Sequence, residues 1–301
     1  MAFRARREKM QEDFPKIPHD EILQQFTAAK LYTELEDRYK AALINLKAYT
    51  DRDCAKLVMV ICTPQVGKFI TPGNTYGFPF IIKTCDNIGI DVYDFTPKVL
   101  ARDVMEITQT PEDGSWSVAG AKLMADLLDT VLRKYDTQRS SRFIGDQKKP
   151  STFGDLPPNQ DETLDDVSTP YHIKSNSQGL RMDYDITFPK KKQTVLVMGG
   201  AKVFTPYLSN DAIATAVLQK RHPDKIIINA GMLHYTMDDF ETLYKEKARF
   251  TEPDVVIVVS DGDDILEEYF SHRNKYARSM RIFAPTPAEE EFYKQLYNSY
   301  K

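Results

Sequence analysis

The sequence predicts an α/β protein whose parallel sheet is covered by helices on both faces. Short, almost continuously apolar segments at residues 56–62, 194–198 and 254–259 are typical of strands that are buried on both faces. Amphipathic helical patterns lie between such segments along the chain. Strands that alternate with helices pair in parallel, and such sheets place ligands at the carboxyl ends of their strands.

The composition narrows the class of protein. With 301 residues the chain can form one large or two small domains, and 28% charged residues are ordinary for a globular protein. A net charge of -4 gives no reason to expect a nucleic-acid partner. No apolar run approaches the roughly 20 residues of a membrane span. The basic start of the chain lacks a following apolar region, so we expect a cytoplasmic protein, or a periplasmic one if a leader has been removed.

The first element is a predicted amphipathic helix at residues 20–49, with Asp20 as its N-cap. Residues 1–50 are therefore expected to form an N-terminal helical segment before an α/β domain at residues 51–301. Two roles stay open for the helix, namely packing on that domain or binding a partner.

The next elements form a β-α-β unit followed by a helix. A strand at 56–62 leads through a loop to a helix at 77–87, which is expected to end before Gly89. A second short strand is predicted at 90–95. Apolar residues at three- and four-residue spacing then predict a helix at 118–134.

A polar, proline-rich insertion is predicted at about 136–190. We expect it to carry short strands near 171–173 and 180–188. The basic run Lys190–Lys192 at its end is expected to be solvated surface.

The last third returns to alternating strands and helices, with strands at 194–198, 225–229 and 254–259. The other predicted elements are helices at 207–221, 236–249 and 262–271, an edge strand at 278–284 and a closing helix at 287–300.

Two short segments resemble the catalytic motifs of a known superfamily. Pro111 to Gly120, Pro-Glu-Asp-Gly-Ser-Trp-Ser-Val-Ala-Gly, resembles the Asp-x-His-Trp-Ser-x-x-Gly signature of SGNH hydrolases and acyltransferases. Val195 to Ala201, Val-Leu-Val-Met-Gly-Gly-Ala, resembles the strand that delivers Gly-Asp-Ser. Their order along the chain is similar to that of the circularly permuted SGNH-like domain of bacterial polysaccharide O-acetyltransferases, such as the alginate O-acetylation proteins. The resemblance covers about residues 35–135 and 150–270, and implies a three-layer α/β/α fold with a mainly parallel central sheet.

The resemblance also implies site residues. In that family a Ser attacks an acyl carbonyl, a His accepts its proton, an Asp orients the His, and a nearby Gly helps to stabilise the oxyanion. Carried onto this sequence, the Asp is Asp113, the His position holds Ser115 and the nucleophile position holds Ala201. The pocket that this implies is made of Asp113, Ser115, Trp116, Gly199, Gly200, Ala201 and Gly231, where Gly231 is the candidate oxyanion glycine.

The two departures from the family pattern determine the predicted function. Ala201 has no nucleophilic atom, and the hydroxyl of Ser115 is too weak a base near neutral pH. We therefore predict a non-catalytic pseudoenzyme that is a structural or binding component of a larger assembly, with protein partners first and a polysaccharide second. The alternative is an active carbohydrate O-acetyltransferase or acetylesterase whose catalytic residues have moved, for which His172 and His234 are the candidate bases.

No cofactor or metal is expected. Three cysteines, Cys54, Cys62 and Cys85, lack the spacing of a disulfide framework or metal site and are expected to be buried thiols. The acidic run at 261–268 lacks the calcium-loop pattern, and the glycines at 199–200 lack a complete nucleotide-binding motif. The tyrosine-rich end at 292–300 offers aromatic area for an interface.

Overall fold

Five parallel strands form the centre of the molecule, in the order β2-β1-β7-β5-β6. The structure is a computed structural model, and it describes residues 31–62, 72–109, 114–136, 148–165, 169–233 and 235–261. The strands are β1 (Lys56–Ile61), β2 (Asp91–Asp94), β5 (Gln193–Gly199), β6 (Lys225–Asn229) and β7 (Val255–Ser260). Every residue of β5 and β7 is buried, which explains why these strands are apolar on both faces.

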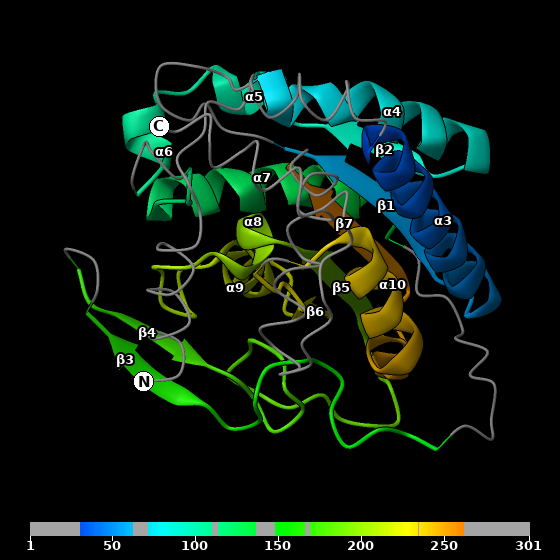
Figure 1. Cartoon of the computed structure of the whole chain (residues 1–301). Coiled ribbons are helices and arrows are strands. Elements are labelled where there is room, and N and C mark those ends of the chain that lie inside the picture. Colours follow the sequence, from blue (N-terminus) through cyan, green and yellow to red (C-terminus); the bar gives the residue numbers. More distant parts are fainter. Residues whose placement is uncertain are drawn as a thin grey trace, which may run out of the picture.

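Helices cover both faces of this sheet (Figure 1), so the fold is a three-layer α/β/α sandwich, as predicted. One face carries α3 (Leu31–Arg52), α4 (Pro72–Ile88) and α10 (Met237–Glu246). The other carries α7 (Val118–Lys134) and α9 (Ala214–Arg221).

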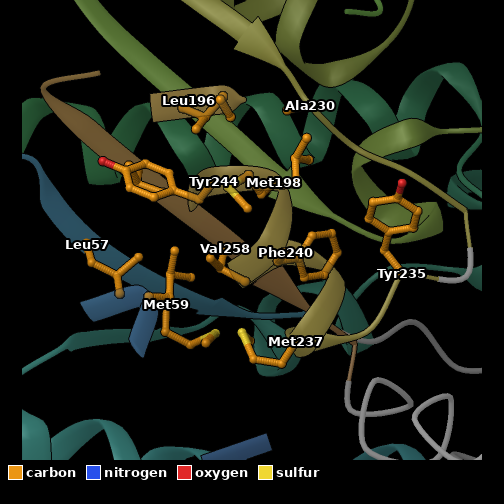
Figure 2. Close-up of a cluster of buried hydrophobic side chains, with 14 of the residues drawn as sticks. Leu57, Met59, Leu196, Met198, Ala230, Tyr235, Met237, Phe240, Tyr244 and Val258 are labelled. Atoms are coloured by element: carbon orange, nitrogen blue, oxygen red, sulfur yellow. The ribbon is translucent and has the colours of Figure 1, made fainter. Parts of the chain in front are cut away.

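Alternate residues of each strand supply the two cores. Figure 2 shows the first core, where Met59 of β1 and Val258 of β7 pack against Phe240 of α10. Their neighbours in sequence, such as Val58 and Val259, belong to the second core beneath α7. This alternation follows from the two-residue repeat of side-chain direction along a strand.

The N-terminal part of the described chain packs on the sheet. Helix α3 runs to Arg52 and buries Tyr39, Leu43 and Leu46 in the first core. The predicted start of this helix, residues 20–30, lies outside the described residues. The division of the chain into residues 1–50 and 51–301 stays a prediction.

The predicted helix at 207–221 is wrong in its first half. A short helix α8 (Ala201–Phe204) follows β5, and α9 begins only at Ala214. Between them Thr205 and Tyr207 have φ values of 53° and 70°, a left-handed conformation that interrupts a right-handed helix. The helix at 236–249 is likewise shorter, because α10 ends at Glu246 and a 3-10 helix η1 (Ala248–Thr251) follows.

The insertion is ordered where it is described, and one of its predicted strands is wrong. β3 (Asp161–Leu164) and β4 (Tyr171–Lys174) form an antiparallel hairpin apart from the main sheet (Figure 1), as predicted for 171–173. Residues 180–188 form no strand, because side-chain amides take over the backbone hydrogen bonds. Asn176 Oδ1 accepts from the Leu180 amide, and Gln178 bonds both the N–H and the carbonyl of Ile186.

The remaining helices are α5 (Thr96–Leu100) and α6 (Val104–Ile107), both on the second face. The elements predicted at 262–271, 278–284 and 287–300 lie outside the described residues. Among the helices that are described, none is long and apolar enough to cross a membrane.

Candidate functional site

The structure brings the two motif segments together at the carboxyl ends of β5 and β1. Lys202, directly after Ala201, donates a hydrogen bond from Nζ to the carbonyl oxygen of Gly114 at 2.8 Å. Its Nζ also lies 5.3 Å from the centre of the Trp116 ring. Asp113 lies outside the described residues, so its place relative to Ser115 stays a prediction.

A short turn holds Ser115 and Trp116 in place before α7. Trp116 forms an isolated bridge with Thr108, and the Ser117 amide donates to the carbonyl of Ile107 at 2.9 Å. Ser117 Oγ then caps α7 by accepting from the Gly120 amide at 3.1 Å. The result is a buried Ser115 and a Trp116 ring that is only 1% exposed.

The backbone at the end of β5 lies very close to its neighbours at Gly199 but not at Gly200. A Cβ on Gly199 would lie 2.6 Å from Val203 Cγ2 and 2.7 Å from the Val259 carbonyl oxygen. A Cβ on Gly200 would meet no atom within 4 Å. Gly199 is therefore required by packing, whereas open space lies beside Gly200.

Gly231, the candidate oxyanion glycine, has an N–H that is already bonded. It donates to Asn229 Oδ1 at 2.9 Å, and Asn229 Nδ2 in turn donates to the Val203 carbonyl at 2.9 Å. A Cβ on Gly231 would lie 2.5 Å from the Phe204 amide nitrogen. The sequence requires glycine here for a close backbone approach, and the bonded amide offers no donor for a developing oxyanion.

His172 belongs to the hairpin, and its side chain faces away from α8. Tyr171 and Ile173, its neighbours on β4, pack with Phe204 in a small apolar cluster. The His172 ring alternates with them and bonds through Nε2 to the carboxylate of Asp161. Hydrogen bonds from His172 and Lys174 hold the pKa of Asp161 below its usual value.

The other described histidine, His222, is bonded to a carboxylate of α7. His222 is the C-cap of α9, and its Nε2 lies 2.6 Å from Asp129 Oδ1 of α7. Burial by itself would raise the pKa of the Asp129 carboxyl, but hydrogen bonds from His222 and Arg133 lower it overall. His234, the second candidate base, lies outside the described residues.

Cys62 directly follows β1 and is completely buried. Burial raises the pKa of its thiol to about 12, and nearby Lys202 offsets only part of this, while Asp261 and Asp94 raise it further. The thiol is therefore protonated near neutral pH, and Cys62 is a poor nucleophile. Among the described residues, no group of three or more His, Cys, Asp or Glu side chains could hold a metal ion.

Lys202 is the site residue that the sequence prediction missed. Its side chain is buried, with 6% of the residue exposed, although lysine is rarely buried without a counter-charge. The signal was present in the sequence as one charged residue within the apolar segment from 195 to 204.

Comparison with known proteins gives matches among solved structures alone. No family model matches the chain, and no curated protein matches it. The chain is similar to the O-acetyltransferase domain of Pseudomonas putida AlgJ, at 12% identity over 83% of this chain and 92% of that chain, with a TM-score of 0.47. It is also similar to Bacillus cereus PatB1, at 10% identity over 77% of this chain and 91% of that chain, with a TM-score of 0.41.

Proposed function

We propose that the chain is a non-catalytic, SGNH-like pseudoenzyme that acts as a structural or binding component of a larger protein assembly. The observation that carries the proposal is the meeting of Ala201, Lys202 and Gly114 at the end of β5. At the position predicted for a nucleophile there is a methyl group. The adjacent side chain is an ammonium group bonded to the loop in which the family pattern has a histidine and this chain has Ser115.

The described residues also offer no replacement for the lost pair at this edge of the sheet. Acyl transfer needs a nucleophile and a base within hydrogen-bond reach of each other. His172 and His222 are each bonded to a carboxylate elsewhere, and the thiol of Cys62 is held protonated by burial. This favours a non-catalytic role over relocated catalytic residues.

Two exposed apolar side chains close to the Trp116 turn are the positions we propose as contacts for a protein partner. Met105 of α6 is 68% exposed and Val118 at the start of α7 is 59% exposed. Helices α6 and α7 are joined by the bond from Ser117 Oγ to the Glu106 carbonyl at 2.6 Å. A partner that covered both side chains would gain apolar contact area, so these two positions are the ones to change in a binding test.

Hydrolysis of p-nitrophenyl acetate tests the catalytic part of the proposal. The purified wild type is compared with the triple variant Ser115→His, Gly200→Asp, Ala201→Ser. A Cβ at position 200 would meet no atom within 4 Å, so there is room for the new side chain there. We expect no turnover by the wild type above the uncatalysed rate and a gain in the triple variant. Turnover by the wild type would refute the pseudoenzyme assignment and favour an active acetylesterase or O-acetyltransferase.

The assembly part needs a separate measurement. Light scattering after size exclusion gives the mass of the complex isolated from cells that express the tagged chain. The double variant Met105→Lys, Val118→Lys should reduce that mass to the mass of the chain. The matched control is Ile44→Lys on α3, which changes another exposed apolar residue and should leave the mass of the complex unchanged. A wild-type chain that is always isolated by itself contradicts the assembly role.

A further inference from the structure

A cavity of about 170 Å³ lies against β6, the strand at one edge of the sheet. Its walls come from residues 181–184 of the insertion, residues 210–213, helix α9 and Ile227 of β6. A cavity of roughly 150 Å³ can hold benzene, so this one has room for a single small molecule. None of the described residues that line it belongs to the candidate functional site around Ala201.

Hydrogen bonds hold the walls of the cavity in place. Gln219 Oε1 of α9 accepts from the Tyr184 hydroxyl at 2.5 Å and from the Ile227 amide at 2.8 Å, which joins the insertion, the helix and the strand. Arg181, which is 1% exposed, donates from its guanidinium to backbone carbonyls at residues 204–208. The cavity is therefore formed before a ligand enters, which lowers the entropic cost of binding.

The inner wall of the cavity is largely apolar. Met182, Ile213 and Ile227 line it and otherwise belong to the two buried cores of the protein. Ala216 of α9 adds only a methyl group, so this part of the wall offers carbon and no hydrogen-bonding side chain. A ligand that fills the cavity should therefore present an apolar group to it.

Charged side chains of both signs line the same cavity. Arg181 and Lys220 are positive, whereas Asp183 and Asp211 are negative, so the four charges cancel. None of the ion pairs in the described part of the chain includes any of the four. A set of separated charges with a sum of zero favours a ligand that also carries both charges and no net charge.

Two of these charged groups are held in position and keep unused hydrogen-bonding capacity. Asp183 Oδ1 accepts from Asn210 Nδ2 at 3.1 Å, and no bond is found for Oδ2 within the described ranges. Lys220 Nζ donates to the Asp211 carbonyl at 3.0 Å, which leaves two of its three N–H donors. Both residues are exposed, and they lie on opposite walls, Asp183 in the insertion and Lys220 on α9.

We propose that this cavity binds an apolar α-amino acid as its zwitterion. The ammonium group of the ligand donates to Asp183, its carboxylate accepts from Lys220, and its side chain lies against Met182, Ile213 and Ile227. Each charged end gains a charge-assisted hydrogen bond, and the side chain gains apolar burial. This inference goes beyond the proposed function and does not depend on it, because the two sites share no residue.

Calorimetric titration of the purified full chain with L-leucine at constant ionic strength tests the inference. Two analogues serve as comparisons, namely isopentylamine, which lacks the carboxylate, and isocaproate, which lacks the ammonium group. We expect saturable binding of leucine and binding at least about tenfold weaker for each analogue, because each analogue loses one charge-assisted hydrogen bond. An absence of saturable leucine binding, or equal affinity for either analogue, overturns the inference.

Two variants assign the ends of the ligand. Lys220→Met should weaken leucine binding at least about tenfold while its affinity for isopentylamine stays that of the wild type, since the amine has no carboxylate to lose a partner. Asp183→Asn should weaken leucine binding in the same way and leave isocaproate binding unchanged. Both altered side chains are exposed, so neither change disturbs a core.

Lys122→Met on α7 is the matched control. Lys122 is another exposed lysine on a helix, but it does not line the cavity. This variant should bind leucine as the wild type does. Full leucine affinity in both Lys220→Met and Asp183→Asn, or an equal loss in Lys122→Met, would overturn the inference.

Discussion

Two glycines at the edge of the sheet should respond very differently to the same substitution. A Cβ on Gly231 would lie 2.5 Å from the Phe204 nitrogen and 2.8 Å from the Val203 carbonyl carbon, both of them backbone atoms. Ordinary contacts begin at 3.4 Å, so the overlap is close to an ångström and the loop after β6 must move away from α8. Overpacking of this kind costs about 1–3 kcal/mol, and we expect the upper end for Gly231→Ala because backbone cannot rotate aside.

Gly200→Ala is the matched control for that change. Gly200 has a φ of -73°, and its added methyl group would meet no atom within 4 Å. The free energy of unfolding should change much less than in Gly231→Ala, because no neighbouring atom has to move to admit the methyl group. Urea unfolding followed by Trp116 fluorescence measures both variants. Equal midpoints for the two variants would refute the close approach of the β6 loop to α8.

Three further predictions concern stability and reactivity. Lys190→Met should lower the free energy of unfolding by about 3 kcal/mol, because it removes the cation that pairs at 2.5 Å with the carboxylate of Asp254, which is 1% exposed and keeps the Thr194 amide as a donor. Urea unfolding measures this, and a loss below about 1 kcal/mol would contradict it. The thiols of Cys62 and Cys85, whose pKa values burial raises to about 12, should resist a thiol reagent at pH 8 until the protein unfolds, and rapid labelling of either would contradict their burial. Because the pKa of Asp129 is lowered in the folded state, its ionised form contributes stability above a pH of about 4, and this stability is lost as pH falls through the folded-state pKa. Asp129→Asn should therefore flatten the acid limb of a plot of unfolding free energy against pH. An unchanged limb would show that the pairing is weak in solution.

Local sequence patterns predicted the sheet and several helices because those elements depend on short-range rules. Helix α7 begins and ends where its apolar spacing predicts, with Ser117 as a conventional N-cap. Strands β5 and β7 are apolar throughout because helices cover both faces of the sheet.

The errors fall where side chains bond to backbone far away in the sequence. Residues 180–188 look like a strand, but Arg181 is buried and donates to the carbonyls of Phe204, Thr205 and Leu208. Burial lowers the pKa of its guanidinium to about 9. Bonds of this kind draw the segment onto the loop after α8 in place of a strand ladder, and no local pattern reveals them.

The sequence by itself determined the α/β class, the buried strands and the absence of a nucleophile at position 201, since these depend on residue identity and on periodicity. Only the tertiary structure decided which charged residues are buried. Lys190 belongs to a run that was predicted to be solvated, yet its side chain is 8% exposed and paired with Asp254. Lys202 is buried against Trp116. The physical reason is that the environment of a lysine is set by whatever packs against it, and here those groups come from segments some 60 to 90 residues away along the chain.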